Sequence, residues 1–242
     1  MTNKKKAVIA ISAVLAFIIL AVCITVPCLY ENGLLGDIHP MKKAKDGQVR
    51  VACVGDSLTY GLGVEHWTKN NYPARLGGML GGGYCVNNFG YSGRTASPEG
   101  DRPYIAEKLY KDSLSFAPEI VVIMLGSNDS KDGNWKGKDK YIEDYVNIIN
   151  SYLTLDSVRE VYIMIPSPVW TVKGKEPYGI SPGVISDQIV PAVEEIAERL
   201  NLKLIDLYSI FEDKPHLFKD GAHPNAEGAG MIASAVYDAI TA

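Results

Sequence analysis

Residues 119–125 read EIVVIML, and the polar tetrapeptide GSND follows directly at residues 126–129. A continuous apolar run of this length is typical of a strand that is covered on both faces, as in a parallel sheet. Four other short runs share this apolar, β-branched character, and we predict strands there too: residues 49–54, 84–88, 161–165 and 202–207. Five such strands predict an α/β sheet protein.

Helical patterns separate the predicted strands. They cover residues 73–80, 104–110, 141–153, 184–200 and 226–240. Pro191 lies inside the fourth pattern and is expected to kink or split that helix. A strand followed by a helix, several times over and without an internal sequence repeat, predicts one doubly wound α/β domain. We expect this flavodoxin-like domain, with a five-stranded parallel sheet, to cover residues 49–242.

The N-terminal residues have a different composition. Three lysines at positions 4–6 precede an uncharged, largely apolar run over residues 7–30. This run is long enough to cross the ~30 Å hydrocarbon core of a membrane as a helix. We therefore predict an N-terminal transmembrane helix within residues 1–30 and a linker over residues 31–48. The positive-inside rule then places the catalytic domain on the extracytoplasmic side of the cell membrane, held by a single span.

Two other interpretations of the apolar run fit the sequence less well. A cleaved signal peptide usually has a shorter apolar core and a small-residue cleavage site, and no good A-x-A site is present. A lipoprotein signal has a small residue before the cysteine, whereas Val22 precedes Cys23. An uncleaved signal-anchor is the favoured interpretation, and secretion after signal cleavage is the alternative.

The charge of the chain is divided unevenly. Residues 1–48 contain six lysines and three acidic residues, so the net charge of −4 for the whole chain leaves −7 for residues 49–242. An acidic domain of this kind is a poor nucleic-acid binder, and no nucleic-acid partner is expected. The same charge argues against a polyanionic substrate that is held by charge alone.

The cysteines give no sign of a disulfide framework or a metal site. Cys53 and Cys85 fall in predicted strands, where a free cysteine commonly behaves as a small apolar side chain. A disulfide between these two cysteines is the alternative. No C-x-x-C or H-x-x-x-H spacing is present, so no metal ligand is expected.

Polar clusters follow the predicted strands or precede the last helix. They read GDSLT at residues 55–59, NFGYSG at 88–93, GSND at 126–129 and DGAHP at 220–224. In doubly wound sheets, ligands bind beyond the carboxyl ends of the strands. We therefore expect the four clusters to meet at one edge of the sheet.

Three side chains in these clusters suit nucleophilic catalysis. Ser57 lies where a strand turns into a helix, and its hydroxyl needs a neighbouring base to become a good nucleophile. His223 has Asp220 three residues upstream, so the carboxylate can hold Nδ1 while Nε2 serves Ser57. Each feature alone has a plainer explanation, since Asp56 and Ser57 suit a helix N-cap and His223 can be an ordinary loop histidine.

Acyl transfer also needs hydrogen-bond donors for the oxyanion that develops on the carbonyl oxygen. The backbone N–H groups of Ser57 and Gly90 and the side-chain amide of Asn128 are the candidates. Taken singly, Gly90 can be a turn glycine and Asn128 a loop cap.

The joint occurrence of these clusters resembles the SGNH, or GDSL-type, hydrolase family, which is named for one Ser, Gly, Asn and His in separate blocks. Residues 55–58 (GDSL) are similar to its first block, Gly90 to the second, residues 126–129 to the third, and Asp220 with His223 to the last. The resemblance runs from about residue 50 to the C-terminus. Ser127 is the one departure, because many members have Thr there.

This resemblance implies a serine esterase. Ser57 attacks an ester carbonyl, His223 acts as base and then as acid, and Asp220 orients His223. The oxyanion is held by the N–H groups of Ser57 and Gly90 and by Asn128, and neither a metal nor an organic cofactor is expected. The absence of a G-x-S-x-G motif in the sequence disfavours the α/β-hydrolase fold.

Residues 124–131, MLGSNDSK, followed by Asn134 and Trp135, resemble the carbohydrate O-acetylesterase branch of the family, in particular sialate O-acetylesterase-like proteins. The resemblance implies hydrolysis of short-chain acyl esters, above all O-acetyl esters, on small-molecule or glycan substrates. Trp135, Tyr91 and Trp170 can stack on sugar rings, or they can be half-buried packing residues.

Three alternatives stay open at this point. A lysophospholipase or thioesterase would need a deep acyl pocket, and the depth of a pocket does not follow from the sequence pattern. A non-catalytic glycan-binding module would keep the fold without turnover. Transfer of the acetyl group to a glycan hydroxyl would use the same Ser–His machinery.

Overall fold

The computed structural model describes residues 12, 14–15, 18–22, 25 and 41–242. Five strands form one parallel sheet in the order β2-β1-β3-β4-β5. The strands are β1 (Val49–Gly55), β2 (Tyr84–Gly90), β3 (Ile120–Met124), β4 (Glu160–Ile165) and β5 (Lys203–Asp206). The predicted five-stranded parallel sheet is therefore confirmed, and its strand order is the flavodoxin-like one.

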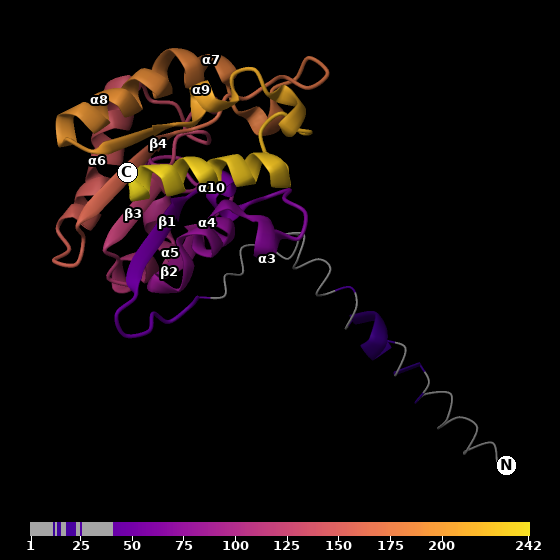
Figure 1. The fold of residues 1–242 in the computed structure, drawn as a ribbon. Coiled ribbons are helices and arrows are strands. Elements are labelled where there is room, and N and C mark those ends of the chain that lie inside the picture. Colours follow the sequence, from indigo (N-terminus) through magenta and orange to yellow (C-terminus); the bar gives the residue numbers. More distant parts are fainter. Residues whose placement is uncertain (1–11, 13, 16–17, 23–24, 26–40) are drawn as a thin grey trace.

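Helices cover both faces of the sheet (Figure 1). One face packs against α4 (Tyr72–Leu80), α9 (Leu207–Phe211) and α10 (Ala226–Thr241). The other face packs against α5 (Lys108–Ser115), α6 (Lys138–Leu153) and α8 (Val190–Leu200). Strand β1 serves both layers, because successive side chains of a strand point to opposite faces. Val51 and Cys53 contact the first layer, whereas Ala52 and Val54 contact the second.

Short elements complete the chain. They are the helices α2 (Ser57–Tyr60), α3 (Trp67–Asn70) and α7 (Pro182–Val184), 3₁₀ turns at Gly81–Gly83, Tyr104–Ala106, Pro177–Gly179 and Pro215–Leu217, and a π-helical turn at Ile185–Ile189. The predicted helix over residues 184–200 is split as expected. The interruption is the π-helical turn at Ile185–Ile189, which ends two residues before Pro191.

The predicted helix over residues 104–110 is wrong. The chain forms a 3₁₀ turn at Tyr104–Ala106, and α5 begins only at Lys108. Tertiary contacts cause the break. The Tyr104 hydroxyl donates to the Phe89 carbonyl at 2.7 Å, and the carboxylate of Glu107, whose backbone is extended, pairs with Arg94 at 2.8 Å.

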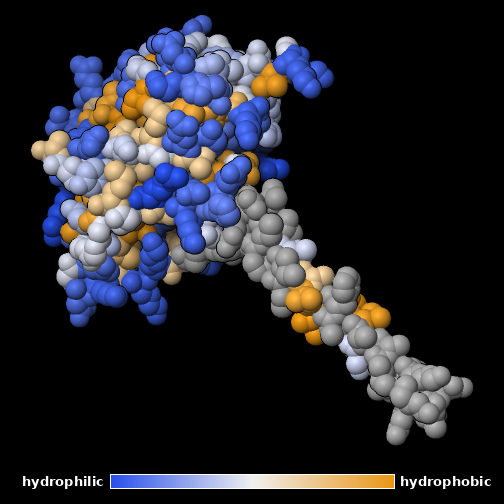
Figure 2. Space-filling model, turned by 45° about the vertical axis from the view of Figure 1, so that its right-hand side comes forward, coloured by the Kyte–Doolittle hydropathy of each residue, from blue (hydrophilic) through white to orange (hydrophobic). Residues whose placement is uncertain are grey.

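Most of the predicted transmembrane helix over residues 1–30 lies outside the described residues. The large apolar side chains that are described there are exposed, among them Ile19 and Leu20. Figure 2 shows hydrophobic surface on this N-terminal segment. Within the described residues, no helix has the length and apolar character needed to cross a membrane. The division into an anchor, a linker and a catalytic domain over residues 49–242 stays a prediction.

Cys53 and Cys85 are buried and have free thiols. They lie on β1 and β2, as predicted, and the alternative of a disulfide between them is not formed. Burial raises the pKa of the Cys53 thiol to about 12, so this cysteine behaves as an apolar core residue.

Candidate active site

The turn between β1 and α2 presents Ser57. Ser57 is the first residue of α2, and the side chain of Asp56 caps the helix by accepting the Leu58 N–H at 3.0 Å. Gly55 allows this turn to approach β3, because a Cβ on Gly55 would lie 2.5 Å from the Met124 carbonyl oxygen. The local sequence therefore places the serine hydroxyl at the carboxyl edge of the sheet, between β1 and β3.

The structure brings Ser57, His223 and Asp220 together. The Nε2 atom of His223 lies 2.8 Å from Ser57 Oγ, and its Nδ1 lies 2.7 Å from Asp220 Oδ2. The other carboxylate oxygen, Oδ1, accepts the backbone N–H groups of Ala222 and His223. Burial raises the pKa of Asp220, but hydrogen bonds and the charge of His223 outweigh it and hold that pKa below its ordinary value. Asp220 is therefore an ionised partner for the imidazole ring.

Tyr178 lies against this pair, and the sequence analysis missed it. Its hydroxyl donates to Asp220 Oδ2 at 2.9 Å, and its ring meets the His223 ring edge to face with centroids 5.1 Å apart. Tyr178 lies on the long loop after β4 and has a left-handed backbone, with φ of 57°. A lone tyrosine in a loop carries no periodic signal, so no sequence pattern could have singled it out.

The glycine of the second block that reaches the site is Gly93 rather than Gly90. The Gly90 N–H already donates to Asn88 Oδ1 at 2.9 Å. A Cβ on Gly90 would lie 2.2 Å from the Tyr60 backbone nitrogen, so Gly90 allows β2 to pack closely on α2. The oxyanion role predicted for Gly90 is therefore not supported. Gly93 lines the same pocket as Ser57.

Asn128 reaches the site from the loop after β3. Its Nδ2 lies 3.2 Å from Asp56 Oδ2 and 3.2 Å from the Arg94 carbonyl oxygen. Both contacts are at the long end of the hydrogen-bond range, so either can be exchanged for a better acceptor. The N–H of Ser57, at the first position of α2, has no partner within that helix.

A pocket of about 190 Å³ opens over these groups. Ser57, Gly93, Asn128 and His223 line it, together with Tyr178 and two cationic side chains, Arg102 and Lys131. The predicted clusters therefore meet at one edge of the sheet, as the doubly wound fold requires.

Two buried carboxyl groups lie beneath the site. Burial raises the pKa of Asp56 to about 6 and that of Asp129 to about 7. Asp129 accepts the backbone N–H groups of Ala96 and Ser97, and so ties the second block to the third. Both carboxyl groups therefore hold the loops that carry the site.

The three candidate stacking aromatics are half-buried packing residues. The Trp135 and Tyr141 rings lie 5.9 Å apart, and the Trp170 and Phe218 rings lie 4.8 Å apart. The ring of Tyr91 is covered by the Arg94 guanidinium, 3.3 Å from its centroid. None of the three lines the pocket above Ser57.

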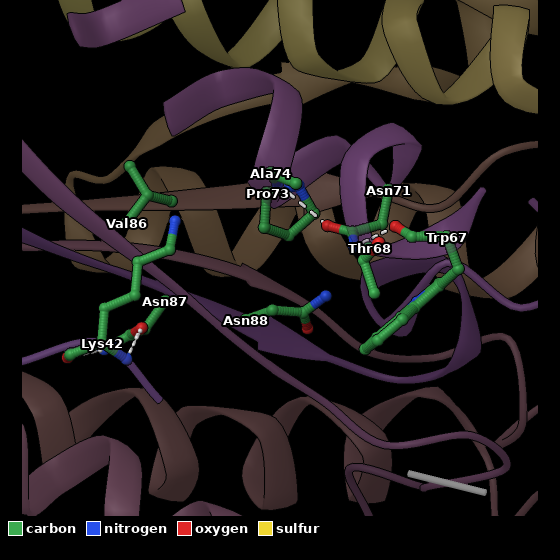
Figure 3. A pocket seen from close by; sticks show the side chains of 9 residues that line it. All are labelled: Lys42, Trp67, Thr68, Asn71, Pro73, Ala74, Val86, Asn87 and Asn88. Atoms are coloured by element: carbon green, nitrogen blue, oxygen red, sulfur yellow. Dashed lines mark hydrogen bonds between the residues drawn. The ribbon is translucent and has the colours of Figure 1, made fainter. Parts of the chain in front are cut away.

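A second pocket, of about 60 Å³, lies between α3, α4 and β2 (Figure 3). The backbone of Lys42 crosses one side of it and is held at both polar groups by Asn87. The Lys42 N–H donates to Asn87 Oδ1 at 2.9 Å, and Asn87 Nδ2 donates to the Lys42 carbonyl at 2.9 Å. Ser57 and His223 do not line this pocket, which is therefore separate from the catalytic cluster.

Comparisons with known proteins agree with this geometry. An acetylxylan esterase from Xylanibacter ruminicola is 36% identical over 234 residues, which cover 87% of this chain and 48% of that protein. The chain therefore spans about half the length of this relative.

Two solved structures share the fold. A carbohydrate acetylesterase family member from Sinorhizobium meliloti matches with a TM-score of 0.68 at 24% identity, covering 80% of this chain and 97% of that one. The native aryl esterase of M. smegmatis matches with a TM-score of 0.64 at 18% identity, covering 80% and 98%.

The profile of the GDSL-like lipase/acylhydrolase family matches residues 53–231. That range contains all the clusters that form the pocket. The chain belongs to the GDSL-like lipase/acylhydrolase family, a family of carboxylic ester hydrolases.

Proposed function

We propose that this chain is a serine esterase that hydrolyses short-chain acyl esters, above all O-acetyl esters, of carbohydrates. The observation that carries the proposal is the hydrogen-bonded series from Ser57 through His223 to Asp220 at the edge of the sheet. The likeness to a protein named an acetylxylan esterase supports the choice of acyl group and of sugar.

The geometry suits a two-step acyl transfer. Ser57 Oγ attacks the ester carbonyl while His223 Nε2, 2.8 Å away, takes the hydroxyl proton. The ionised Asp220 stabilises the imidazolium that forms. His223 then returns the proton to the leaving alcohol, and a water molecule, activated by the same nitrogen, releases the acyl group from Ser57.

The oxyanion needs donors close to Ser57. We assign this role to the N–H groups of Ser57 and Gly93 and to the side-chain amide of Asn128, all at the pocket. Asn128 exchanges one of its two 3.2 Å contacts for the oxyanion when the ester is bound. In this proposal Gly93 takes the place that the sequence analysis gave to Gly90.

We also propose that residues 7–30 anchor the chain in the cell membrane and that the catalytic domain lies outside the cytoplasm. The three lysines before the apolar run support this orientation. A mass measurement on protein from the membrane fraction tests the anchor. Retention of the first residues supports a signal-anchor, whereas their loss means that the segment is cleaved and the domain released.

The esterase proposal is tested with p-nitrophenyl acetate, butyrate and octanoate and with acetylated xylan, using the full-length chain. We expect turnover that falls with acyl length, and loss of roughly three or more orders of magnitude in Ser57→Ala. Ser234→Ala is the matched control, because Ser234 is an exposed serine on α10. Equal activity of the parent and Ser57→Ala contradicts the mechanism, and a preference for octanoate contradicts the short acyl group.

A further inference from the structure

Two cationic side chains line the pocket above Ser57, although the domain as a whole is acidic. Arg102 comes from the loop before α5, and Lys131 comes from the loop after β3. No carboxylate side chain is among the described residues that line this pocket. The pocket therefore presents positive charge on a domain whose net charge is −7.

Neither cation forms an ion pair with a described residue, and the charge of Lys131 acts on the buried Asp56 only at longer range, where it partly offsets the rise in the pKa of that carboxyl group. Among the residues that the structure describes, no carboxylate oxygen lies within 4.0 Å of the charged nitrogens of Arg102 or Lys131. The acids around the site have other partners. Asp220 is held by His223 and Tyr178, Asp101 accepts a hydrogen bond from a side-chain amide, and the buried Asp56 caps α2.

One buried amide ties the two cationic loops together. Asn134, only 7% exposed, accepts the Asp101 N–H through Oδ1 and donates through Nδ2 to Asp101 Oδ1 and to the Asn128 carbonyl. The Asn134 N–H donates to the Lys131 carbonyl at 3.0 Å. The backbones that carry Arg102 and Lys131 are therefore fixed relative to each other and to Asn128.

Arg102 also lies directly beside the oxyanion donors. Its Nη1 lies 3.4 Å and its Cδ 3.5 Å from the position that a Cβ on Gly93 would occupy. The Arg102 carbonyl accepts the Thr95 N–H at 3.0 Å, which fixes its backbone. An anion held by this guanidinium is therefore bound beside Gly93, in the same pocket as Ser57.

We propose that Arg102 and Lys131 form an anion subsite that selects acyl esters of acidic carbohydrates, meaning sugars that carry a carboxylate close to the ester. The proposal rests on the proposed esterase function and names its substrate class. A guanidinium binds a carboxylate through two parallel hydrogen bonds, and an ammonium adds a point charge. A single carboxylate also suits the negative domain, which repels a densely charged polyanion.

The test uses two sugars that differ in one group. Methyl glucuronoside and methyl glucoside, acetylated at the same hydroxyl, differ only in a carboxylate against a hydroxymethyl group. We expect the full-length chain to favour the acidic ester about tenfold in kcat/KM, mainly through KM. Added salt is expected to reduce this preference, because it screens exposed charges.

The variant Arg102→Gln/Lys131→Gln removes the proposed subsite. We expect the ratio of kcat/KM for the two esters to fall to about one. The control, Lys111→Gln/Arg159→Gln, removes the same charge from exposed side chains on α5 and at the amino end of β4. This control is expected to keep the parental ratio. A parent without preference, or a preference that survives in Arg102→Gln/Lys131→Gln, overturns the proposal.

A binding measurement on a variant that cannot hydrolyse the ester tests this proposal independently of the esterase proposal. Saturation-transfer NMR measures the two intact esters on Ser57→Ala, with and without the two subsite substitutions. Preferential binding of the acidic ester, lost with those substitutions, supports the subsite even if p-nitrophenyl acetate is not hydrolysed. Equal binding of the two esters overturns the subsite, while Ser57-dependent hydrolysis of p-nitrophenyl acetate leaves the esterase function intact.

Discussion

The hydroxyl of Tyr178 donates to Asp220 Oδ2, the same oxygen that faces His223 Nδ1. Two donors therefore share one carboxylate oxygen, at 2.9 Å and 2.7 Å. Among the described residues, the tyrosine has no hydrogen bond to the nucleophile or to the pocket donors, so we regard it as a positioning residue. It limits the rotation of the carboxylate and covers one edge of the imidazole ring.

Tyr178→Phe keeps the ring and removes this hydrogen bond. We expect kcat/KM for p-nitrophenyl acetate to fall roughly three- to tenfold, because a typical intramolecular hydrogen bond contributes a net of about 0.5–1.5 kcal/mol and the other Asp220 contacts remain. Tyr208→Phe, on α9, is the control and should be unchanged.

A pH experiment gives this substitution a second readout. The folded-state pKa of Asp220 is depressed, so its ionised form stabilises the fold above the ordinary aspartate pKa of 3.8, and this stabilisation is lost as the pH falls below that value. Tyr178→Phe should therefore raise the folded-state pKa of Asp220 towards its ordinary value, because one hydrogen bond to the ionised form is lost, and carboxyl-carbon NMR titration measures this pKa. An unchanged pKa would show that the hydroxyl does not act through the carboxylate.

Asn128→Ala tests the proposed side-chain donor to the oxyanion. We expect kcat to fall by about two to three orders of magnitude with little change in KM, because the donor acts mainly in the transition state. Asn150→Ala, on the exposed face of α6, is the matched control. Since Asn128 also bonds to Asp56 and Arg94, thermal melting must show that the variant is folded. A loss below tenfold in folded protein would remove Asn128 from the oxyanion site.

Gly90 and Gly93 should respond differently to alanine. In Gly90→Ala the new Cβ meets the Tyr60 nitrogen at 2.2 Å, so we expect a loss of about 1–3 kcal/mol or more in the free energy of unfolding. In Gly93→Ala the Cβ meets only the flexible Arg102 at 3.4 Å, and the cost is the left-handed backbone, about 1–2 kcal/mol. Urea unfolding measures the free energy of unfolding of both variants. Under conditions where both are folded, the esterase activity should be lower in Gly93→Ala. A lower activity in Gly90→Ala would instead support Gly90 as the oxyanion donor.

The buried Asp129 should make the fold less stable at neutral pH. Its folded-state pKa of about 7 exceeds the ordinary 3.8, so between these values the folded chain binds more protons than the unfolded chain. The free energy of unfolding therefore falls as the pH rises through this window. In Asp129→Asn this pH dependence should become shallower. The variant is also expected to be less stable at pH ~5, because an amide oxygen replaces only one of the two acceptors for Ala96 and Ser97. Urea unfolding at several pH values measures the free energy of unfolding of both proteins. If its dependence on pH is the same in the parent and in Asp129→Asn, the raised pKa is contradicted.

Much of the fold could be predicted because its strands leave a clear signal. Residues 120–125 are apolar throughout, and β3 lies within that run with every residue buried. The short helices α2 and α9 could not be predicted, since four or five residues carry no helical period. The error at residues 104–110 has another origin. There, the Tyr104 hydrogen bond and the Arg94–Glu107 ion pair, both made with distant segments, override the local pattern.

The part of the site that could be predicted consists of residues in sequence blocks directly after predicted strands or before the last helix. Ser57, His223 and Asp220 were placed in one cluster from sequence blocks alone, and the structure brings these side chains into contact. The choice between Gly90 and Gly93 was not accessible, because it depends on which N–H already has an acceptor. Arg102 and Tyr178 come from loops without any pattern, and their contribution depends on tertiary contacts that no spacing reveals.

The two hydrogen bonds between Asn87 and the Lys42 backbone limit how far the catalytic domain can lie from the membrane under the proposed anchoring. The chain is fastened to the sheet at Lys42, so only residues 31–41 separate the proposed membrane span from the catalytic domain. Even fully extended, that tether reaches about 40 Å. Under this anchoring, the catalytic domain stays within this distance of the membrane surface. Glycan esters farther from the membrane would be out of its reach.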